Sequence, residues 1–365
     1  MIKILLINYE YPPLGGGTAI ANQYLAKEFA RIKNLKMDIL TSSPGIFSQQ
    51  YLYDNIRIIR LNIGKNSQNF HHQSYTDLFR FFLISTAWTL NHRKDYDLIH
   101  AFSGLPGSIT AWISRLPYLV SFRGADEPGY EPRHDFLLKI IKPLLKIIYS
   151  RAKFLDANSQ YLKSLLLKSF PNLSIQVINN GVDTTKFFPG EKMISQSVIL
   201  CTSRLAQRKG VEFLIKAMPL VLAKIPQAKL QLVGEGVLSS ALKQLVKKLH
   251  LINSVKFLGL VEHDQLPTTY RQAKLFVLPS LSESQSNSLL EALASGLPVV
   301  ATNVGGNPEL INSQNEILVP PADSQKLAKA IIKALNKKWP KIHLSSESSW
   351  QKAASHYVKI YRQNL

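Results

Sequence analysis

Residues 278–310 of this chain read LPSLSESQSNSLLEALASGLPVVATNVGGNPEL, and this stretch decides the fold. The apolar residues 275–278 predict a strand that ends at Pro279. A helix is expected over residues 288–294, capped by Asn287 or a preceding serine and closed by Gly296. Residues 298–301 predict a second buried strand. The stretch is therefore a β-loop-α-β unit, and ligands of open α/β sheets bind at this kind of junction.

Both halves of the chain repeat this alternation of short apolar runs and helical patterns. The predicted elements lie at residues 3–8, 19–31, 37–41, 56–61, 98–101, 108–114 and 118–121, and again at 198–202, 211–224, 229–233, 239–249 and 255–258. Such alternation predicts an α/β protein with two parallel, doubly wound, Rossmann-like sheets. We expect a first domain at residues 1–183, a linker at 184–196, a second domain at 197–348 and a helix at 349–365. A cleft between two such domains suits an enzyme with two substrates.

Composition indicates an ordinary globular protein with an unusual charge. The chain has 365 residues, 45% hydrophobic, and a formal net charge of +20. The excess is +8 up to Asp183 and +12 beyond it, so both halves would attract an anionic partner. The single cysteine, Cys201, lies in an apolar run and fits a buried position in a reducing compartment.

The apolar segments predict no membrane span. Residues 1–7 are too short for a signal peptide, and residues 81–90 reach only about half the length that a bilayer requires. We expect a cytoplasmic protein, either free or peripheral on the inner face of the membrane.

A basic loop opens the second domain. Arg204, Arg208 and Lys209 follow one predicted strand and precede a helix, where backbone N–H groups and cations together favour an anion such as phosphate. A solvated basic loop is the alternative. Glu291 lies inside an apolar helix and needs a partner, either a sugar or ribose hydroxyl or a core arginine.

Other loops at predicted strand ends add weaker indications. Gly16 and Gly17 leave the first strand in a glycine-rich loop that would let backbone approach a ligand, although a plain tight turn explains them equally well. Glu235 lies between two glycines after residues 230–233. The helix start that follows Glu283 offers N–H groups for phosphate or hydroxyl contacts; its candidate residues are Ser286, Asn287, Ser288 and Leu289.

Taken together, the second half resembles family 4 of the retaining glycosyltransferases, which has the GT-B fold. The resemblance rests on Ser203-Arg204-Leu205 with Lys209-Gly210, Gly234-Glu235-Gly236, Phe257-Leu258-Gly259, Pro279-Ser280, Glu283 and Glu291 eight positions apart, Gly296 to Val300, and Gly305-Gly306 with Pro308-Glu309. It implies that the second domain holds a nucleotide-sugar and the first an acceptor, with the C-terminal helix returning to the first domain. In that family pattern Arg204 and Lys209 neutralise the diphosphate, Glu291 takes the ribose hydroxyls and Glu283 orients the sugar.

Two departures from the family pattern stand out. Many members have Gly-Phe-Gly after the first glutamate, whereas this chain has Ser284-Gln285-Ser286. Many also carry a His-Gly-x-Asp segment near the reacting sugar, and the matching residues here run from Arg123 to Asp126. An arginine cannot act as a base near neutral pH, but it could stabilise phosphate or bind an acidic sugar or acceptor. With His100 in the matching strand 98–100, Arg123 and Asp126 are the candidates for the acceptor or sugar side.

The predicted function is therefore retaining transfer of a hexose-type sugar to a hydroxyl acceptor, without metal and without a cofactor. Catalysis is assigned to Arg204, Lys209 and Glu283. The acceptor would be a saccharide or a lipid-linked compound, in polysaccharide, lipopolysaccharide or glycolipid synthesis. Residues 133–153 mix basic and apolar groups, which fits either an anionic membrane surface or a core-packed helix with a basic rim.

Two other classes remain open from the sequence. A sugar-nucleotide epimerase or a phosphorylase would share the two Rossmann-like domains. A non-enzymatic polyanion binder would account for the charge, but the chain carries no recognition motif for nucleic acid, so we expect no nucleic-acid partner.

Overall fold

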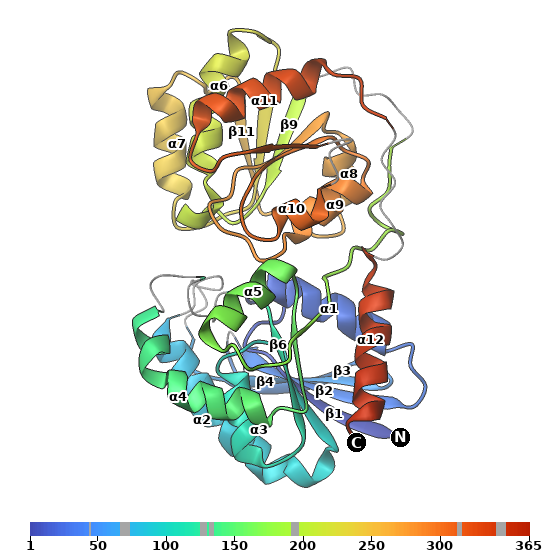
Figure 1. Ribbon diagram of the computed structural model, residues 1–365. Helices are drawn as coiled ribbons and strands as arrows, with labels where there is room; N and C mark the ends of the chain where they lie inside the picture. Colours follow the sequence, from blue (N-terminus) through green and yellow to red (C-terminus); the bar gives the residue numbers. More distant parts are fainter. Residues whose placement is uncertain are drawn as a thin grey trace. The chain divides into compact units, whose positions relative to one another are not determined.

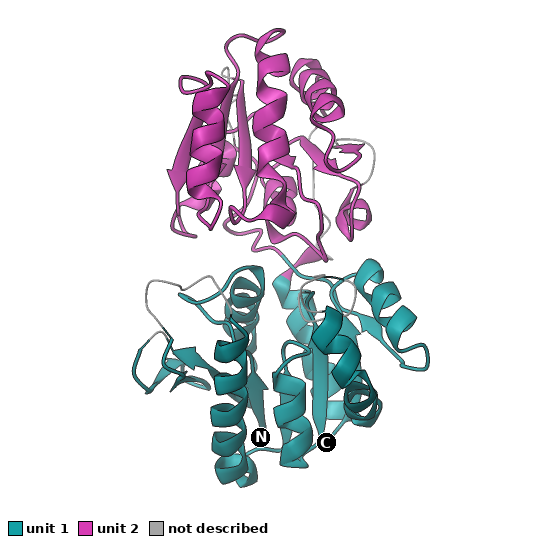
Figure 2. Ribbon diagram, turned by 90° about the vertical axis from the view of Figure 1, so that its left-hand side faces the viewer, with its two compact units in different colours: residues 1–181, 350–365 teal, residues 182–349 magenta. Residues whose placement is uncertain are grey.

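The computed structural model describes residues 1–365 except Pro44 and residues 66–73, 125–129, 131–134, 191–196, 312–315 and 341–347. The chain forms two compact units (Figure 1). Unit 1 contains Met1–Gly181 and Trp350–Leu365, and unit 2 contains Val182–Ser349. The chain therefore passes between the units twice, and both termini belong to unit 1 (Figure 2).

Unit 1 is built on an eight-stranded sheet with the order β3-β4-β2-β1-β5-β6-β7-β8. Its strands are β1 (Ile2–Ile7), β2 (Leu35–Ser43), β3 (Ser48–Tyr53), β4 (Ile56–Asn62), β5 (Leu98–Ala101), β6 (Tyr118–Phe122), β7 (Phe154–Ala157) and β8 (Gln176–Val177). The edge strand β3 is antiparallel to its neighbour, and the other pairings are parallel. The direction in which strands are added reverses at β1, between β2 and β5. Ligands of doubly wound sheets bind beyond the carboxyl ends of strands at such a reversal.

Helices cover both faces of this sheet, because alternate residues of a strand point to opposite sides. Its helices are α1 (Gly17–Phe29), α2 (Tyr75–His92), the 3-10 turn η2 (Arg93–Asp95), α3 (Gly107–Ser114), α4 (Asp135–Arg151), α5 (Gln160–Ser169) and α12 (Trp350–Gln363). Ile4 and Leu6 join a core with α1 and α12. Leu5 and Ile7 join the opposite core with α2, α3, α4 and α5. The two faces are visible in Figure 1.

The C-terminal helix α12 buries the stripe that its helical spacing predicts. The buried residues include Trp350, Ala353, Ala354, Tyr357, Val358 and Tyr361. The Trp350 ring stacks on Tyr24 of α1 with centroids 5.7 Å apart, and Phe29 contacts the rings of Tyr357 and Tyr361. The predicted return of this helix to the first domain is confirmed.

Unit 2 has a six-stranded sheet with the order β11-β10-β9-β12-β13-β14, in which every pairing is parallel. Its strands are β9 (Val198–Thr202), β10 (Lys229–Val233), β11 (Val255–Gly259), β12 (Leu275–Leu278), β13 (Val299–Thr302) and β14 (Glu316–Val319). Numbered within the unit, the order is 3-2-1-4-5-6, the Rossmann arrangement that the sequence predicts. The direction of strand addition reverses between β9 and β12.

Helices again cover both faces of the second sheet. They are the 3-10 turn η4 (Gln207–Lys209), α6 (Val211–Leu222), α7 (Ser239–Lys248), α8 (Leu266–Arg271), α9 (Asn287–Ala294), α10 (Asn307–Leu310) and α11 (Ser324–Asn336). Ile199 and Cys201 of β9 face α6, α7 and α11, whereas Leu200 faces α8 and α9. Cys201 is 1% exposed and occupies the buried position expected of it.

No helix within the described part of the chain combines the length and apolarity that crossing a membrane requires. Residues 81–90 lie within α2, which packs against the sheet through Phe81.

Candidate active site

The loops that follow β9 and β12 meet at the carboxyl edge of unit 2. The Lys209 ammonium donates to Glu283 Oε1 at 2.5 Å, and the Ser280 hydroxyl donates to the same oxygen at 2.7 Å. The backbone joins the loops as well, since Leu281 N–H donates to the Arg208 carbonyl at 2.7 Å. Two of the predicted catalytic residues, 74 positions apart, therefore form one ion pair at the point where the strand order reverses.

Glycine allows these loops to approach so closely. Gly210 has φ +59°, and a Cβ there would lie 2.2 Å from the Pro279 carbonyl oxygen. Gly305, after β13, has φ +55°, and its Cβ would lie 1.6 Å from the Glu283 carbonyl oxygen. Gly306 N–H donates to that same oxygen at 3.3 Å. The backbone of Glu283 is thus enclosed by a loop that tolerates no side chain at residue 305.

The electrostatic balance of this cluster is positive. Burial lowers the pKa of Lys209 to about 8, with Arg208 and Arg204 acting in the same direction and Glu283 opposing them. Burial raises the pKa of Glu283, but Lys209 and Arg208 outweigh it and hold that pKa below the ordinary value. Near pH 7 the pair is therefore ionised, and the partly exposed Arg204 and Arg208 add positive charge beside it.

Helix α9 begins immediately after this cluster. Ser286 is its N-cap, because its hydroxyl accepts from Leu289 N–H at 3.3 Å and lies 3.1 Å from the Ser288 hydroxyl. Asn287 is then the first residue of the helix, and the preceding Ser284 and Gln285 are almost fully buried. The N-terminal end of α9 and the cations after β9 therefore lie at the same edge of the sheet, an arrangement that favours an anion.

Glu291 lies in the second turn of α9, held from two sides. The Tyr270 hydroxyl donates to Oε2 at 2.8 Å, and His263 Nε2 lies 3.3 Å from Oε1. Burial raises the pKa of Tyr270 well above its ordinary value, so this hydroxyl remains a donor. The sequence predicts a partner for Glu291. In the structure its partners are a tyrosine and a histidine rather than a core arginine. Neither was predicted, because they precede Glu291 by 21 and 28 positions and no local pattern links them to it.

The loop after β10 reaches the same cluster. Glu235 is exposed, and its carbonyl accepts from Leu205 N–H at 2.9 Å. This contact places Glu235 beside the basic loop that carries Arg204. The structure therefore brings together the predicted residues of unit 2, from Arg204 to Glu291, along one edge.

The predicted residues of unit 1 lie at the carboxyl ends of its own strands or within its core. Gly16 is the N-cap of α1, followed by Gly17, and Gly16 N–H donates to the Glu10 carboxylate at 3.3 Å. Their predicted contact with the donor stays a prediction. Asp126 lies outside the described residues.

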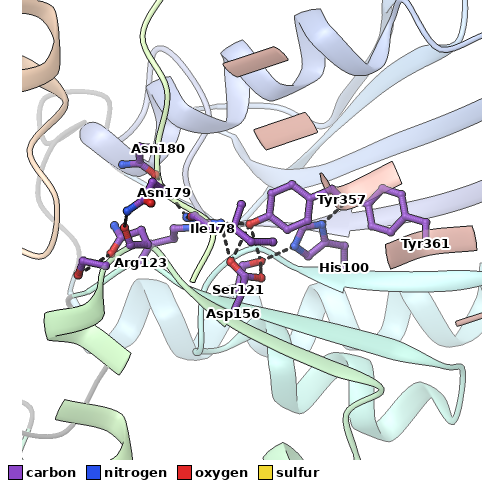
Figure 3. Close-up of polar contacts among 11 residues, drawn as sticks. His100, Ser121, Arg123, Asp156, Ile178, Asn179, Asn180, Tyr357 and Tyr361 are labelled. Atoms are coloured by element: carbon purple, nitrogen blue, oxygen red, sulfur yellow. Dashed lines mark hydrogen bonds and ion pairs between the residues drawn. The ribbon is translucent and has the colours of Figure 1, made fainter. Parts of the chain in front are cut away.

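His100 and Arg123 occupy the interior of unit 1 (Figure 3). His100 has no exposed surface, and its ring nitrogens each lie 2.7 Å from a hydroxyl, of Tyr361 and of Ser121. Burial and the charge of Arg123 lower its pKa to about 3, so the ring is neutral. Arg123 is 8% exposed and pairs with the buried Asp156 at 3.0 Å. This placement does not support direct contact of His100 with an acceptor, and the acceptor-side role of both residues stays untested.

Within the described ranges, no group of three or more His, Cys, Asp or Glu side chains is arranged to hold a metal ion. In the charged cluster of unit 2, Lys209 forms an ion pair with Glu283.

Comparison with known proteins agrees with this geometry. Residues 196–337 match the family of glycosyl transferases group 1, and residues 15–186 match glycosyltransferase family 4. These two matches span most of the chain, which belongs to the family 4 glycosyltransferases with the GT-B fold. The protein is thus a glycosyltransferase, and the comparisons do not favour an epimerase, a phosphorylase or a polyanion binder.

Individual relatives and solved structures cover the whole chain or half of it. An uncharacterized glycosyltransferase of Methanocaldococcus jannaschii is 27% identical over 99% of this chain and 98% of its own. A GDP-mannose-dependent monoacylated alpha-(1-6)-phosphatidylinositol monomannoside mannosyltransferase of Corynebacterium glutamicum is 33% identical over 47% of this chain and 52% of its own. Sucrose-phosphate synthase from Thermosynechococcus elongatus matches in structure with a TM-score of 0.81, 23% identity and coverage of 100% and 99%. Anabaena HepE in complex with UDP-glucose matches with a TM-score of 0.72, 23% identity and coverage of 100% and 98%.

The fit of Gly305 against Glu283 gives a first prediction. In Gly305→Ala the new Cβ must displace the Glu283 backbone, so the variant should lose most of its sugar-transfer activity and melt roughly 2–8 °C lower. Gly45→Ala is the control, because a Cβ there meets nothing within 4 Å. Thermal unfolding and a transfer assay would check both variants. Wild-type activity in Gly305→Ala would show that the position of Glu283 does not depend on this contact.

Proposed function

We propose that this protein is a retaining, metal-independent glycosyltransferase that moves a hexose-type sugar from a nucleoside-diphosphate sugar to a hydroxyl acceptor. The observation that carries the proposal is the Lys209–Glu283 ion pair, with Arg204 and Arg208 beside it, at the strand reversal of unit 2. A nucleotide-sugar donor is supported by the GDP-mannose dependence of the Corynebacterium glutamicum relative and by the complex of Anabaena HepE with UDP-glucose.

Each side chain has a part in binding this donor. Lys209 and Arg204 neutralise the diphosphate, and the N–H groups of residues 286–289 add donors at the start of α9. Glu283, fixed by Lys209 and Ser280, orients the sugar hydroxyls. Glu291 accepts from the ribose hydroxyls, because Tyr270 and His263 already set the direction of its carboxylate. Glu235 and Arg208 line the same edge.

The chemistry proceeds on one face of the sugar. The bond from the anomeric carbon to the diphosphate oxygen breaks, and its electron pair stays on the phosphate. The acceptor oxygen forms the new bond on the same face, and its proton passes to an oxygen of the departing diphosphate. The anomeric configuration is therefore retained without a protein nucleophile. Lys209 and Arg204 stabilise the charge that develops on the diphosphate, which is electrostatic preorganisation.

The acceptor side is proposed to include lipid, because unit 1 exposes an unusual apolar surface. Helix α4 packs on the core through Leu138 and Leu145. Its outer face nevertheless exposes Phe136, Ile140 and Ile147 by 77%, 61% and 45%. Lysines alternate with these side chains at positions 139, 142 and 146 and are also exposed. Helix α4 thus has a core-packed face with a basic rim, and its exposed apolar side chains support the proposed membrane contact.

Helix α2 also exposes apolar side chains. It packs on the same core as α4 and exposes Tyr75, Phe79, Leu83 and Leu90 by 49%, 60%, 50% and 40%. Apolar side chains beside lysines suit an anionic membrane surface, where each basic residue adds about 1 kcal/mol of attraction. At such a surface this protein would meet a lipid-linked acceptor of polysaccharide, lipopolysaccharide or glycolipid synthesis.

The function is tested first by its donor. A thermal-shift panel of UDP-, GDP- and ADP-sugars should show stabilisation by one nucleotide class, because a ligand that binds only the native state raises Tm. Transfer with the selected donor should then continue in EDTA, and NMR of the product should show the donor's anomeric configuration. Inversion, or loss of transfer in EDTA that Mg²⁺ restores, would contradict the proposal.

The pKa of Lys209 predicts how donor binding depends on pH. Phosphate oxygens favour the ammonium form, so binding raises the pKa from about 8 in the free protein. Affinity for the nucleoside diphosphate should be greatest near pH 7 and fall above pH 8, by up to about tenfold per pH unit. In Lys209→Arg the cation remains charged, so its affinity between about pH 7 and pH 9.5 should be nearly flat. Calorimetric titrations would measure the affinities of wild type and Lys209→Arg across this pH range. The same pH dependence in both proteins would show that Lys209 does not bind the phosphate.

The apolar surface of α2 and α4 predicts binding to anionic vesicles. At low salt the protein should co-sediment with phosphatidylglycerol-containing vesicles and not with phosphatidylcholine vesicles. Phe136→Glu combined with Ile140→Glu should weaken this binding at least about tenfold, because both buried apolar area and charge become unfavourable. Ile252→Glu is the control, an equally exposed apolar residue of unit 2. Equal sedimentation with both vesicle types would exclude a contact that depends on anionic lipid.

A further inference from the structure

A buried ion pair in unit 1 has no place in the donor site. Arg123, after β6, donates to Asp156 of β7 at 3.0 Å, and Asp156 has no exposed surface (Figure 3). The carboxylate also accepts from the hydroxyls of Ser121 at 2.5 Å and Tyr357 at 2.7 Å. The Arg123 guanidinium lies 4.5 Å from the centre of the Phe102 ring. The pair is therefore almost completely buried, and its charges depend on each other.

The other side of the guanidinium holds the chain where it leaves unit 1. Arg123 Nη1 donates to the Ile178 carbonyl and to the Asn180 side-chain oxygen, both at 3.3 Å. Ile178 N–H donates to the Ala157 carbonyl of β7 at 3.0 Å. The first connection between the units follows at once, because unit 1 ends at Gly181. Arg123 thus anchors the last residues before this connection.

The same guanidinium holds the helix with which the chain returns. Arg123 Nη2 donates to the Tyr357 hydroxyl of α12, and His100 adds a hydrogen bond to Tyr361 one turn further on. Helix α12 begins at Trp350, the first residue after the second connection. Both connections are therefore attached to one buried cation.

Beyond the connections, the two chain segments are joined again within unit 2. Val182 and Ser349 form a parallel β-bridge, and Val182 N–H donates to the Ser348 carbonyl at 2.9 Å. Each connection is thus short. Arg123 holds its end in unit 1, and the bridge between Val182 and Ser349 holds its end in unit 2. Two such connections permit fewer modes of rotation than a single flexible linker.

We propose that Arg123, paired with Asp156, is a positioning residue that holds both connections and so restricts the movement of the two units to a narrow hinge. Releasing either connection would leave part of a buried charge without its hydrogen bonds, which is strongly unfavourable. The consequence for catalysis rests on the proposed function, in which unit 2 binds the donor, and on the expectation that unit 1 binds the acceptor. Arginine suits this position because its planar fork reaches several acceptors at once.

The experiment measures inter-unit distances in single molecules by fluorescence energy transfer. Cysteines replace the exposed Asp54 in unit 1 and Lys247 in unit 2, and the native Cys201 is buried and stays unlabelled. The test variant is Tyr357→Phe, which loses the contact with α12 but keeps the ion pair. The matched control is Tyr118→Phe, which removes another buried tyrosine hydrogen bond of unit 1, to the Ile148 carbonyl.

Without ligand, Tyr357→Phe should broaden the distribution of transfer efficiencies relative to wild type, and Tyr118→Phe should not. Asn180→Ala tests the first connection and should also broaden the distribution of transfer efficiencies. Arg123→Lys keeps a cation beside Asp156 but loses the planar guanidinium that reaches several acceptors. The width of its distribution should therefore lie between those of wild type and Tyr357→Phe. Arg123→Ala is less informative, because an unpaired Asp156 could unfold unit 1.

Kinetics separates positioning from general damage. Tyr357→Phe should lower kcat at least about fivefold, while the Kd of the nucleoside diphosphate selected by the thermal-shift panel changes by less than about twofold. A distribution as narrow in Tyr357→Phe and Asn180→Ala as in Tyr118→Phe would overturn the proposal, whatever their activity. If no sugar is transferred by the wild type, the proposed function fails, and the distance measurement still decides the role of Arg123 because it needs no turnover.

Discussion

The structure of this protein depends on one constraint of parallel sheets: each strand must be followed by a crossover that packs on one face. Where the order of strands reverses, the crossovers leave in opposite directions, and the loops between them remain uncovered. In unit 2 this occurs between β9 and β12. The loops after these strands carry Lys209 and Glu283, so the topology alone brings two distant residues together. Gly210 and Gly305 then allow these loops to pack against the backbone of Pro279 and Glu283 at distances that a Cβ atom would prevent.

The structure contains two buried ion pairs whose surroundings differ, and the surroundings decide what each pair can bind. Lys209 and Glu283 lie at a sheet edge with further cations beside them, so a phosphate can join the cluster. Arg123 and Asp156 lie in the interior of unit 1, where the Ile178 carbonyl and the Tyr357 hydroxyl are among their hydrogen-bond partners. The first arrangement is open to a ligand. The second is almost completely buried, and its partners include residues of both segments that connect the units.

Much of the fold and of the donor edge follows from local patterns. Short apolar runs alternating with helical spacing predict two doubly wound sheets, and the buried stripe of α12 is visible in its sequence. The clustering of Arg204, Lys209 and Glu283 also follows, because each comes directly after a predicted parallel strand. The partners of Glu291 could not be predicted, since Tyr270 and His263 reach it from other elements. For the same reason the sequence places His100 near an acceptor, whereas its ring is enclosed by Tyr361 and Ser121.

The sequence by itself determined the fold class, the family and the edge of the sheet at which the charged residues gather. These depend on periodicity and on the order of residues along the chain, which are local properties. Only the tertiary structure decided what each buried polar group contacts. Arg123 is the clearest case: its position in the chain suggests a ligand, but Asp156 and Tyr357 lie 33 and 234 positions away. A buried charge takes the partners that surround it in space, and the sequence does not contain those distances.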